Sequence, residues 1–368
     1  MENSNACNTA VLGLNNNFYG SYSSNQVFFK EMMQAFRKAG IRVFIASSIE
    51  EAINIYETEE ISFSFSFSKY KYYLNGVPLY DLYQVVNYQW ISDNPLKMKM
   101  DVDSKWIKYI FIDDEYPLVL NKNAANGYIF RPLGYLEGNL MTYGKKNGSV
   151  LIPCKIRNLN QIASNINESP LAGKMKKFLD EYERNSSYIR ALKSFFECEN
   201  ITDNVEKETI FRHTNEYIRV EKRIWVIEHI EEFPVDVLSE DCNNRIKNKR
   251  VNFLSPVSYS IVKQLINTYS YVINVDPNYH ACIHDRFIKS VSSGTICITN
   301  RNDLMDLINS ITYSFDKPQS IMEAIYAAES EEDLFETQLE IIAPYSWEKS
   351  VRAVVDDYKK GKNDEVSD

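Results

Sequence analysis

Residues 274–300 read NVDPNYHACIHDRFIKSVSSGTICITN, and this stretch is the most informative of the sequence. Pro277 and Asn278 interrupt an apolar run, and Asp285 to Ser292 has the pattern of a short helix. The β-branched segment Thr295 to Thr299 predicts a strand. The stretch therefore predicts a strand–loop–helix–strand unit, with a polar loop at the carboxyl end of its first strand.

Two residues at the start of this helix, His284 and Arg286, suit the binding of an anion. In open α/β sheets ligands bind at the carboxyl ends of the strands, and a helix start offers backbone N–H groups that favour phosphate. An arginine there can hold two phosphate oxygens at once. The alternative is that His284 only caps the helix and that Arg286 is a surface charge.

Length and charge limit the classes of protein. A chain of 368 residues predicts two domains, and 44% hydrophobic with 13% aromatic residues is enough to fill two cores. The formal net charge of -9 disfavours nucleic acid as a partner, although a local basic site for a small phosphorylated ligand is compatible with it.

The cysteines and the amino terminus predict an intracellular protein. The six cysteines show no CxxC spacing, so neither a zinc site nor a cysteine nucleophile is indicated. The amino terminus lacks a basic region followed by an apolar core, and no apolar run approaches the length of a membrane span. We expect a cytoplasmic protein, whose membrane contact, if any, is peripheral.

Strands and helices alternate along the first half of the chain. Strands are expected at residues 10–14, 41–46, 61–67, 85–91 and 106–113, and helices at 25–39 and 49–56. The serines of the segment 61–67, ISFSFSF, are expected on a solvated or helix-facing side. Carboxylates follow two of these strands, at Asp93 and at Asp113–Asp114, and Asp113–Asp114 is the one acidic pair that resembles a metal site. This order predicts a doubly wound sheet.

A glycine-rich segment without apolar periodicity, GNLMTYGKKNG at 138–148, is expected to link the two domains. Residues 1–137 then form an N-terminal Rossmann-like domain, residues 149–343 a C-terminal one, and residues 344–368 a terminal helix and a charged, frayed tail. In the second domain, strands are expected at 149–155, 235–238 and 251–254, and helices at 170–184, 188–198, 205–231, 257–268, 302–310 and 319–328.

Several familiar signatures are missing from the sequence. It contains no GxxxxGK[ST] loop, no GxGxxG after the first strand, no GxSxG elbow and no HExxH. P-loop kinases and GTPases, typical nicotinamide dehydrogenases, α/β-hydrolases and zincins are therefore not leading candidates.

The pattern from Val251 to Asn300 resembles the group 1 glycosyltransferases of the GT-B fold, in particular the spore-maturation-type subgroup. The resemblance is carried by a loop proline, a His-x-Arg at the helix start, a small-Gly pair and a strand that ends in Thr and a polar residue. These positions hold Pro277, His284, Arg286, Ser293, Gly294, Thr299 and Asn300. Weaker matches are residues 90–95 (WISDNP), 112–114 (IDD) and 345–348 (YSWE).

The resemblance implies a GT-B architecture, with two Rossmann-like domains facing a central cleft and a C-terminal helix that crosses back to the N-terminal domain. It implies a nucleotide-diphosphate sugar as donor and a glycan, glycolipid or protein as acceptor, with neither a cofactor nor a metal. Donor-binding residues would then be Asn278, His284, Arg286, Thr299 and Asn300; His284 and Asp93 would be catalytic; and Asn15, Asn16 and Asn17 would bind the acceptor or the sugar. Asp93 has an alternative role as a cap of the turn before Pro95.

Two positions depart from the family pattern. Lys289 stands where many relatives have a glutamate that accepts hydrogen bonds from the donor ribose, and Asn94 replaces the histidine of an Asp-His-Pro turn. The leading hypothesis is a metal-independent glycosyltransferase of polysaccharide, lipid-linked glycan or protein glycosylation. The alternatives are an inactive GT-B protein that binds a nucleotide sugar or acts as a scaffold, and a GT-B epimerase or phosphorylase.

Overall fold

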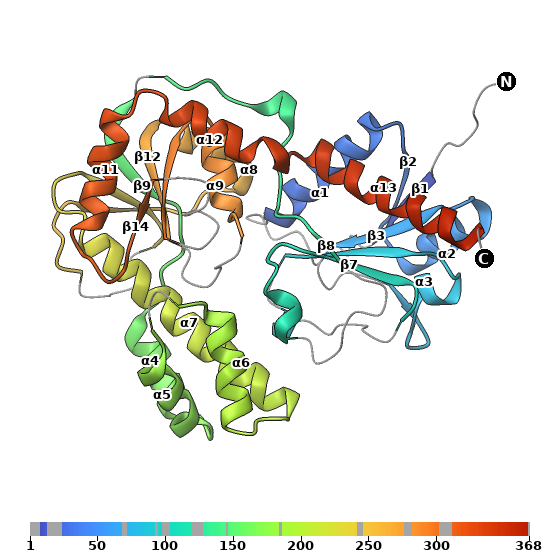
Figure 1. The fold of residues 1–368 in the computed structure, drawn as a ribbon, viewed down its shortest axis with the longest axis horizontal. Coiled ribbons are helices and arrows are strands. Elements are labelled where there is room, and N and C mark those ends of the chain that lie inside the picture. Colours follow the sequence, from blue (N-terminus) through green and yellow to red (C-terminus); the bar gives the residue numbers. More distant parts are fainter. Residues whose placement is uncertain are drawn as a thin grey trace. The chain divides into compact units, whose positions relative to one another are not determined.

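A computed structural model describes residues 8–12, 24–67, 72–92, 95–97, 104–119, 128–144, 146–183, 186–240, 246–275, 282–301 and 311–366. The chain divides into two compact units (Figure 1). Unit 1 contains Met1–Asn139 and Pro344–Asp368, and unit 2 contains Leu140–Ala343. The chain therefore leaves unit 1 once and returns to it at its carboxyl end.

Unit 1 contains a parallel sheet of six strands in the order β2-β1-β3-β6-β7-β8. The strands are β1 (Asn8–Leu12), β2 (Arg42–Ala46), β3 (Phe63–Phe67), β6 (Asn87–Ile91), β7 (Ile107–Phe111) and β8 (Tyr128–Phe130). The helices described in unit 1 are α1 (Ser24–Lys38), α2 (Ile49–Thr58), α3 (Leu79–Leu82) and α13 (Trp347–Val366). The strand order changes direction between β1 and β3, and such a switch point is where open α/β sheets bind ligands.

The serines of β3 are not on a solvated side, contrary to one part of the expectation. Ser64 and Ser66 are fully buried, and both hydrogen-bond to the Asn87 side chain of the neighbouring strand β6, over 2.9 and 3.0 Å. Both faces of a parallel sheet are covered, so a polar residue on either face needs a partner within the protein. Asn87 supplies that partner.

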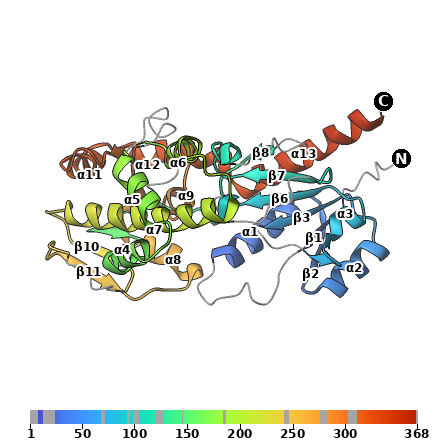
Figure 2. The ribbon, with the colours of Figure 1, turned by 90° about the horizontal axis from the view of Figure 1, so that it is seen from below.

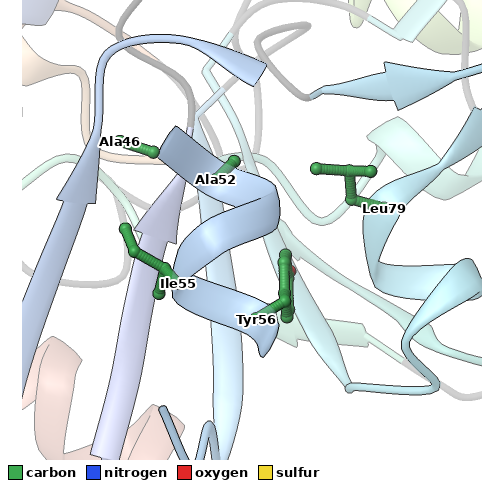
Figure 3. Packing of buried hydrophobic residues seen from close by; sticks show 5 residues of the cluster. All are labelled: Ala46, Ala52, Ile55, Tyr56 and Leu79. Carbon is green, nitrogen blue, oxygen red and sulfur yellow. The ribbon is translucent and has the colours of Figure 1, made fainter. Parts of the chain in front are cut away.

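One face of the sheet is covered by α2, which packs as an amphipathic helix. Ala52, Ile55 and Tyr56 point from α2 toward Ala46 of β2 and Leu79 of α3 (Figure 3). The Ser48 side chain caps the helix by accepting a hydrogen bond from the Glu51 amide over 3.2 Å.

A small hairpin between β3 and β6 was not anticipated from the sequence. It consists of β4 (Tyr73–Leu74) and β5 (Val77–Pro78), joined by Asn75 and Gly76 with φ of 52° and 82°. An Asn-Gly pair with two positive φ angles is typical of the tight turn that joins antiparallel strands.

The last helix, α13, packs on unit 1 and completes its core. Trp347 is fully buried, with its ring 6.0 Å from that of Phe28 and 5.2 Å from that of Trp90, and its Nε1 donates to Glu31 Oε2 over 3.0 Å. A Cβ on Gly134 would lie 2.6 Å from the Tyr345 carbonyl oxygen, so the returning chain fits only against a residue without a side chain.

Unit 2 contains a second parallel sheet of six strands, in the order β11-β10-β9-β12-β13-β14. The strands are β9 (Asn147–Ile152), β10 (Val235–Leu238), β11 (Val251–Leu254), β12 (Tyr269–Asn274), β13 (Ile296–Asn300) and β14 (Thr312–Tyr313). Numbered within the unit, the order is 3-2-1-4-5-6, that of dinucleotide-binding Rossmann folds. Its switch point lies between β9 and β12. The helices α8 (Tyr259–Ile266), α9 (Asp285–Ser292), α11 (Ser320–Ser330) and α12 (Leu334–Ile342) belong to this unit.

Between β9 and β10 the chain forms a helical insertion, which we define as α4 (Leu159–Asn167), α5 (Ala172–Glu181), α6 (Tyr188–Cys198) and α7 (Asn204–Glu228). These helices lie together, below the sheet of their unit in Figure 1, and Figure 2 shows α7 lengthwise. Asn158, Ser187 and Asp203 cap α4, α6 and α7 with their side chains. The sequence predicted α5, α6 and α7 but missed α4.

One further difference concerns the end of the last helix. The tail that was expected to fray continues as helix α13 to Val366. The predicted helix at 302–310 lies outside the described residues. Among the helices of the described residues, none is long and apolar enough to span a membrane.

The burial of Trp347 predicts that unit 1 depends on α13. Trp347→Ala should lower the free energy of unfolding by about 3–5 kcal/mol, because it leaves a cavity between Phe28 and Trp90. Deletion of residues 344–368 should lower stability further and reduce solubility. The measurement is urea unfolding, with Trp106→Ala at a half-buried position as the control. Equal midpoints for the Trp347 variant and the wild type would contradict the packing described here.

Candidate functional site

The candidate site lies at the carboxyl end of β12, beside the switch point of the unit 2 sheet. β12 ends at Asn274, and α9 leads from this end of the sheet back to β13, which ends at Asn300. Asn274, Thr299 and Asn300 are all buried polar residues at neighbouring strand ends. The sequence therefore concentrates polar side chains where a sheet of this order binds nucleotides.

His284 is the residue that begins α9. It is the N-cap, and its Nδ1 lies 3.0 Å from the backbone nitrogen of Arg286 and 2.7 Å from Asp285 Oδ1. The two contacts require different protonation states, because an unprotonated Nδ1 accepts from the amide whereas a protonated Nδ1 donates to the carboxylate. Its side chain is 11% exposed. The capping role weighed for His284 is thus present in the structure.

Arg286 is held against the end of β12. Its Nη1 donates to Asn274 Oδ1 over 3.3 Å and to the Val275 carbonyl oxygen over 3.1 Å. Within the described part of the chain, Nε and Nη2 make no hydrogen bond. One edge of the guanidinium is therefore fixed by the strand end, while Nε and Nη2 carry donors of the type that an anion accepts.

A network of buried polar atoms fixes the strand end itself. Asn274 Nδ2 donates to Thr299 Oγ1 over 3.0 Å, and the Tyr313 hydroxyl donates to the Asn274 carbonyl oxygen over 2.9 Å. Thr299 is 2% exposed, and its hydroxyl accepts the hydrogen bond that orients the Asn274 side chain. Asn300 is 4% exposed. Thr299 therefore belongs to the network that holds Arg286, and Asn300 is buried at the end of the same strand.

Asp285 belongs to this cluster and was missed from the sequence. Burial raises the pKa of its carboxyl, but His284, Arg286 and Lys289 outweigh burial and hold the pKa well below its usual range. Asp285 is therefore ionised at neutral pH. An acidic residue in the first turn of a helix is favoured by the helix dipole, and this signal is present in the sequence.

Lys289 and Tyr259 form a close pair on the next turn of α9. The Lys289 ammonium lies 3.1 Å from the centroid of the Tyr259 ring, and the Tyr259 hydroxyl lies 3.5 Å from Asp285 Oδ2. Lys289 thus packs against α8 through Tyr259. Lys289 thus has a hydrogen-bond donor at the position where many members of the family that the sequence resembles have a carboxylate.

Several predicted site residues lie outside the described residues: Asn15, Asn16, Asn17, Asp93 and Asn278. The acidic pair after β7 is described. Asp113 is fully buried and its Oδ1 accepts from the Glu115 amide over 2.9 Å, while Asp114 is exposed. In the described ranges no group of three or more His, Cys, Asp or Glu side chains is arranged to hold a metal ion.

The cysteine beside the site is a core residue. Cys297 of β13 is fully buried, and burial raises the pKa of its thiol to about 12. A thiol with such a pKa is protonated at neutral pH and is a poor nucleophile.

Gly294, at the end of α9, lets the segment 140–144 approach the helix. Its φ is +73°, and a Cβ would lie 2.5 Å from the Thr142 carbonyl oxygen. The Met141 amide donates to the Ser292 carbonyl oxygen over 3.0 Å, and Lys146 Nζ donates to the Gly294 carbonyl oxygen and, over 2.7 Å, to Thr295 Oγ1. The chain that enters unit 2 is therefore fastened to the end of the site helix.

Sequence comparisons give no relatives, since no family model and no curated protein matches the chain. Solved structures do match. A glycosyltransferase involved in avilamycin A biosynthesis aligns with a TM-score of 0.55 at 9% identity, over 96% of this chain and 97% of its own. The T4 phage β-glucosyltransferase with its UDP-glucose substrate gives 0.55 at 10% identity, over 97% and 98%. A sucrose-phosphate synthase from Thermosynechococcus elongatus gives 0.50 at 8% identity, over 96% and 98%.

The chain has the GT-B fold. The alignments cover nearly the whole of each chain, so both units and the returning helix are part of the likeness. At about a tenth identity the likeness concerns the fold and leaves function to be argued from the site.

The close approach at Gly294 predicts a large effect from a single methyl group. Gly294→Ala should lower the free energy of unfolding by at least about 1 kcal/mol, because alanine is strained at positive φ and its Cβ would meet backbone atoms. Gly173→Ala is the control: nothing lies within 4 Å of its Cβ position, and in helix α5 alanine should stabilise by about 0.5–1 kcal/mol. Chemical denaturation of both variants measures the difference. Equal effects would refute the proposed role of Gly294.

Proposed function

We propose that this protein is a metal-independent glycosyltransferase that moves a sugar from a nucleotide-diphosphate donor to a glycan, lipid-linked or protein acceptor. The observation that carries the proposal is the orientation of Arg286 by Asn274 and Val275, at the end of β12 beside the switch point of a Rossmann-type sheet in a GT-B fold. The resemblance of residues 251–300 to the spore-maturation-type subgroup supports the same assignment.

The chemistry of sugar transfer requires stabilisation of the leaving diphosphate, whose negative charge grows as the sugar departs. Arg286 would bind the diphosphate through the donors that do not contact β12. The amide of Asp285, which makes no hydrogen bond with the described residues, would add a contact at the positive end of the α9 dipole. His284 would donate a proton or a hydrogen bond to the leaving phosphate.

The charges at the start of α9 are compatible with an anion. Arg286 and Lys289 contribute two positive charges and Asp285 one negative charge, so the fixed sum is +1. Asp285 Oδ1 lies 2.7 Å from His284 Nδ1. Asp285 would thus position the His284 ring.

The acceptor side of the proposal rests on unit 1. Asn15, Asn16 and Asn17 follow β1, at the switch point of its sheet, and Asp93 follows β6. We propose the three asparagines as acceptor or sugar ligands and Asp93 as the general base. A T4 phage relative in fold is a DNA-modifying enzyme, but the net charge of -9 disfavours DNA as the acceptor here.

A second candidate function is favoured by Lys289. Its ammonium packs on the Tyr259 ring, so the place of a carboxylate that would accept from the donor ribose holds a cation. A GT-B protein that binds a nucleotide sugar without turnover is consistent with this change. Incubation with uridine, guanosine, cytidine and thymidine diphosphate sugars separates the two: release of the nucleoside diphosphate indicates an enzyme, and saturable binding without release indicates the binding protein.

Arg286 gives the sharpest prediction for donor binding. Arg286→Ala should weaken nucleoside diphosphate binding by about ten- to a hundredfold, since charge-assisted contacts are worth roughly 1.5–3 kcal/mol. Arg286→Lys should recover part of the loss, because lysine keeps the charge but not the fork of donors. Calorimetric titration with the diphosphate that stabilises the wild type most in a thermal-shift screen measures both.

The matched control for Arg286 is Arg212→Ala, which removes an exposed arginine from α7 of the same unit. Its affinity should equal that of the wild type. His284→Ala should affect turnover more than binding, if the imidazole stabilises the leaving phosphate. Unchanged affinity in Arg286→Ala, with circular dichroism showing an intact fold, would exclude this arginine from the donor site.

Metal independence is tested with a chelator. Turnover should persist in EDTA at the rate measured with added magnesium or manganese, because cationic side chains and helix amides replace the ion in the proposed mechanism. Loss of turnover in EDTA and its recovery on addition of either metal would overturn this part of the proposal. In that case Asp113–Asp114 would be the first pair to replace with asparagine.

A further inference from the structure

The helical insertion contains a cavity of about 380 Å³ between α4, α5 and α7. This volume lies within the range of about 300–1,000 Å³ that is typical of small-molecule sites. All residues that line the cavity belong to unit 2 and come from the insertion between β9 and β10. The residues proposed for the donor at the start of α9 are not among them.

The lining of the cavity combines aromatic rings with equal numbers of positive and negative groups. Tyr182 and Tyr217 contribute rings, Lys176 and Lys222 contribute cations, and Asp180 and Glu221 contribute carboxylates. The charges sum to zero, so the cavity has no preference for a strongly anionic ligand such as a diphosphate. Four ionic groups also make it unsuitable for a wholly apolar ligand.

Lys222 lines one side of the cavity and is held in place by specific partners. It is 1% exposed, its Nζ donates to the Tyr182 hydroxyl over 3.2 Å, and the ammonium lies 5.1 Å from the centroid of the Tyr182 ring. The Tyr182 hydroxyl in turn donates to the Ser186 carbonyl oxygen over 3.2 Å. A lysine is seldom buried to this degree without specific partners, and these partners fix the ring and the ammonium at one side of the cavity.

The same lysine connects the insertion to the sheet of unit 2. Its ammonium lies 4.7 Å from the centroid of the Phe315 ring, and that ring lies 5.6 Å from Tyr313, edge to face. The Tyr313 hydroxyl donates to the backbone carbonyl oxygen of Asn274. The side chain of the same asparagine accepts a hydrogen bond from Arg286. The position of α7 is therefore set by the strand ends that carry the donor-side residues.

We propose that this cavity is a binding site for a neutral saccharide unit. A pyranose presents C–H groups on its faces and hydroxyls around its edge. The ring of Tyr217 suits a face, and the carboxylates and ammonium groups suit the hydroxyls as acceptors and donors. Saccharide binding at this cavity goes beyond the proposed glycosyltransferase function and does not depend on it.

The test measures saccharide binding to the full chain by saturation-transfer NMR, with glucose, N-acetylglucosamine, maltose and cellobiose as probes. Ala163→Trp fills the cavity from α4, and Ala327→Trp makes the same change at an exposed position of α11. Tyr217→Ala removes one ring from the cavity, and Tyr326→Ala removes an exposed tyrosine from α11. Thermal unfolding of each variant confirms that it is folded.

At least one probe should bind the wild type saturably. Its affinity should fall at least tenfold in Ala163→Trp and in Tyr217→Ala, and should be unchanged in Ala327→Trp, Tyr326→Ala and Arg286→Ala. Nucleoside diphosphate affinity should be the same in both cavity variants as in the wild type, so a failure of donor binding is distinguishable from a failure at the cavity. Absence of binding for all four probes, or binding that is lost in Arg286→Ala but kept in Ala163→Trp, would overturn the proposal.

Discussion

The hydrogen bond from Arg286 Nη1 to Asn274 Oδ1 is the interaction on which the candidate site depends. It joins the first turn of α9 to the end of β12, and the Asn274 amide is oriented by Thr299 of the next strand. Tyr313 holds the carbonyl of the same asparagine. Without these contacts, the arginine side chain would lose conformational entropy when it binds a ligand. Because the contacts already hold Arg286, that entropy is lost when the protein folds.

The sequence predicted the elements whose signals are local. The bounds of α9 agree with the prediction at both ends, because His284 caps its start and Gly294 follows its end with a positive φ. That the last helix packs on unit 1 was implied by the family resemblance, and Val351, Val354 and Val355 supply the buried apolar face of that helix. The α/β class follows from the alternation of such elements and was therefore accessible from sequence, whereas the GT-B arrangement came from the family resemblance.

The partners of buried polar groups were not accessible in this way, because they lie on neighbouring strands far apart in the chain. Ser64 and Ser66 of β3 hydrogen-bond to Asn87 of β6, and Thr299 of β13 hydrogen-bonds to Asn274 of β12. The periodicity of the sequence indicates that a side chain faces inward, but register and strand order determine which residue it contacts. Asp285 was overlooked for a different reason: its first-turn position was visible in the sequence, but its contact with His284 was not anticipated.

The charge of the whole chain constrains how a diphosphate would be bound under the proposed function. With a net charge of -9 the protein repels anions at long range, so electrostatic steering cannot concentrate the donor. The fixed charge of +1 from Arg286, Lys289 and Asp285 is small, and salt screens charges separated by more than about 8–10 Å. Affinity must therefore come from direct contacts with the guanidinium and the helix amide. Such contacts act only on a correctly placed ligand, so they favour selectivity over rapid capture.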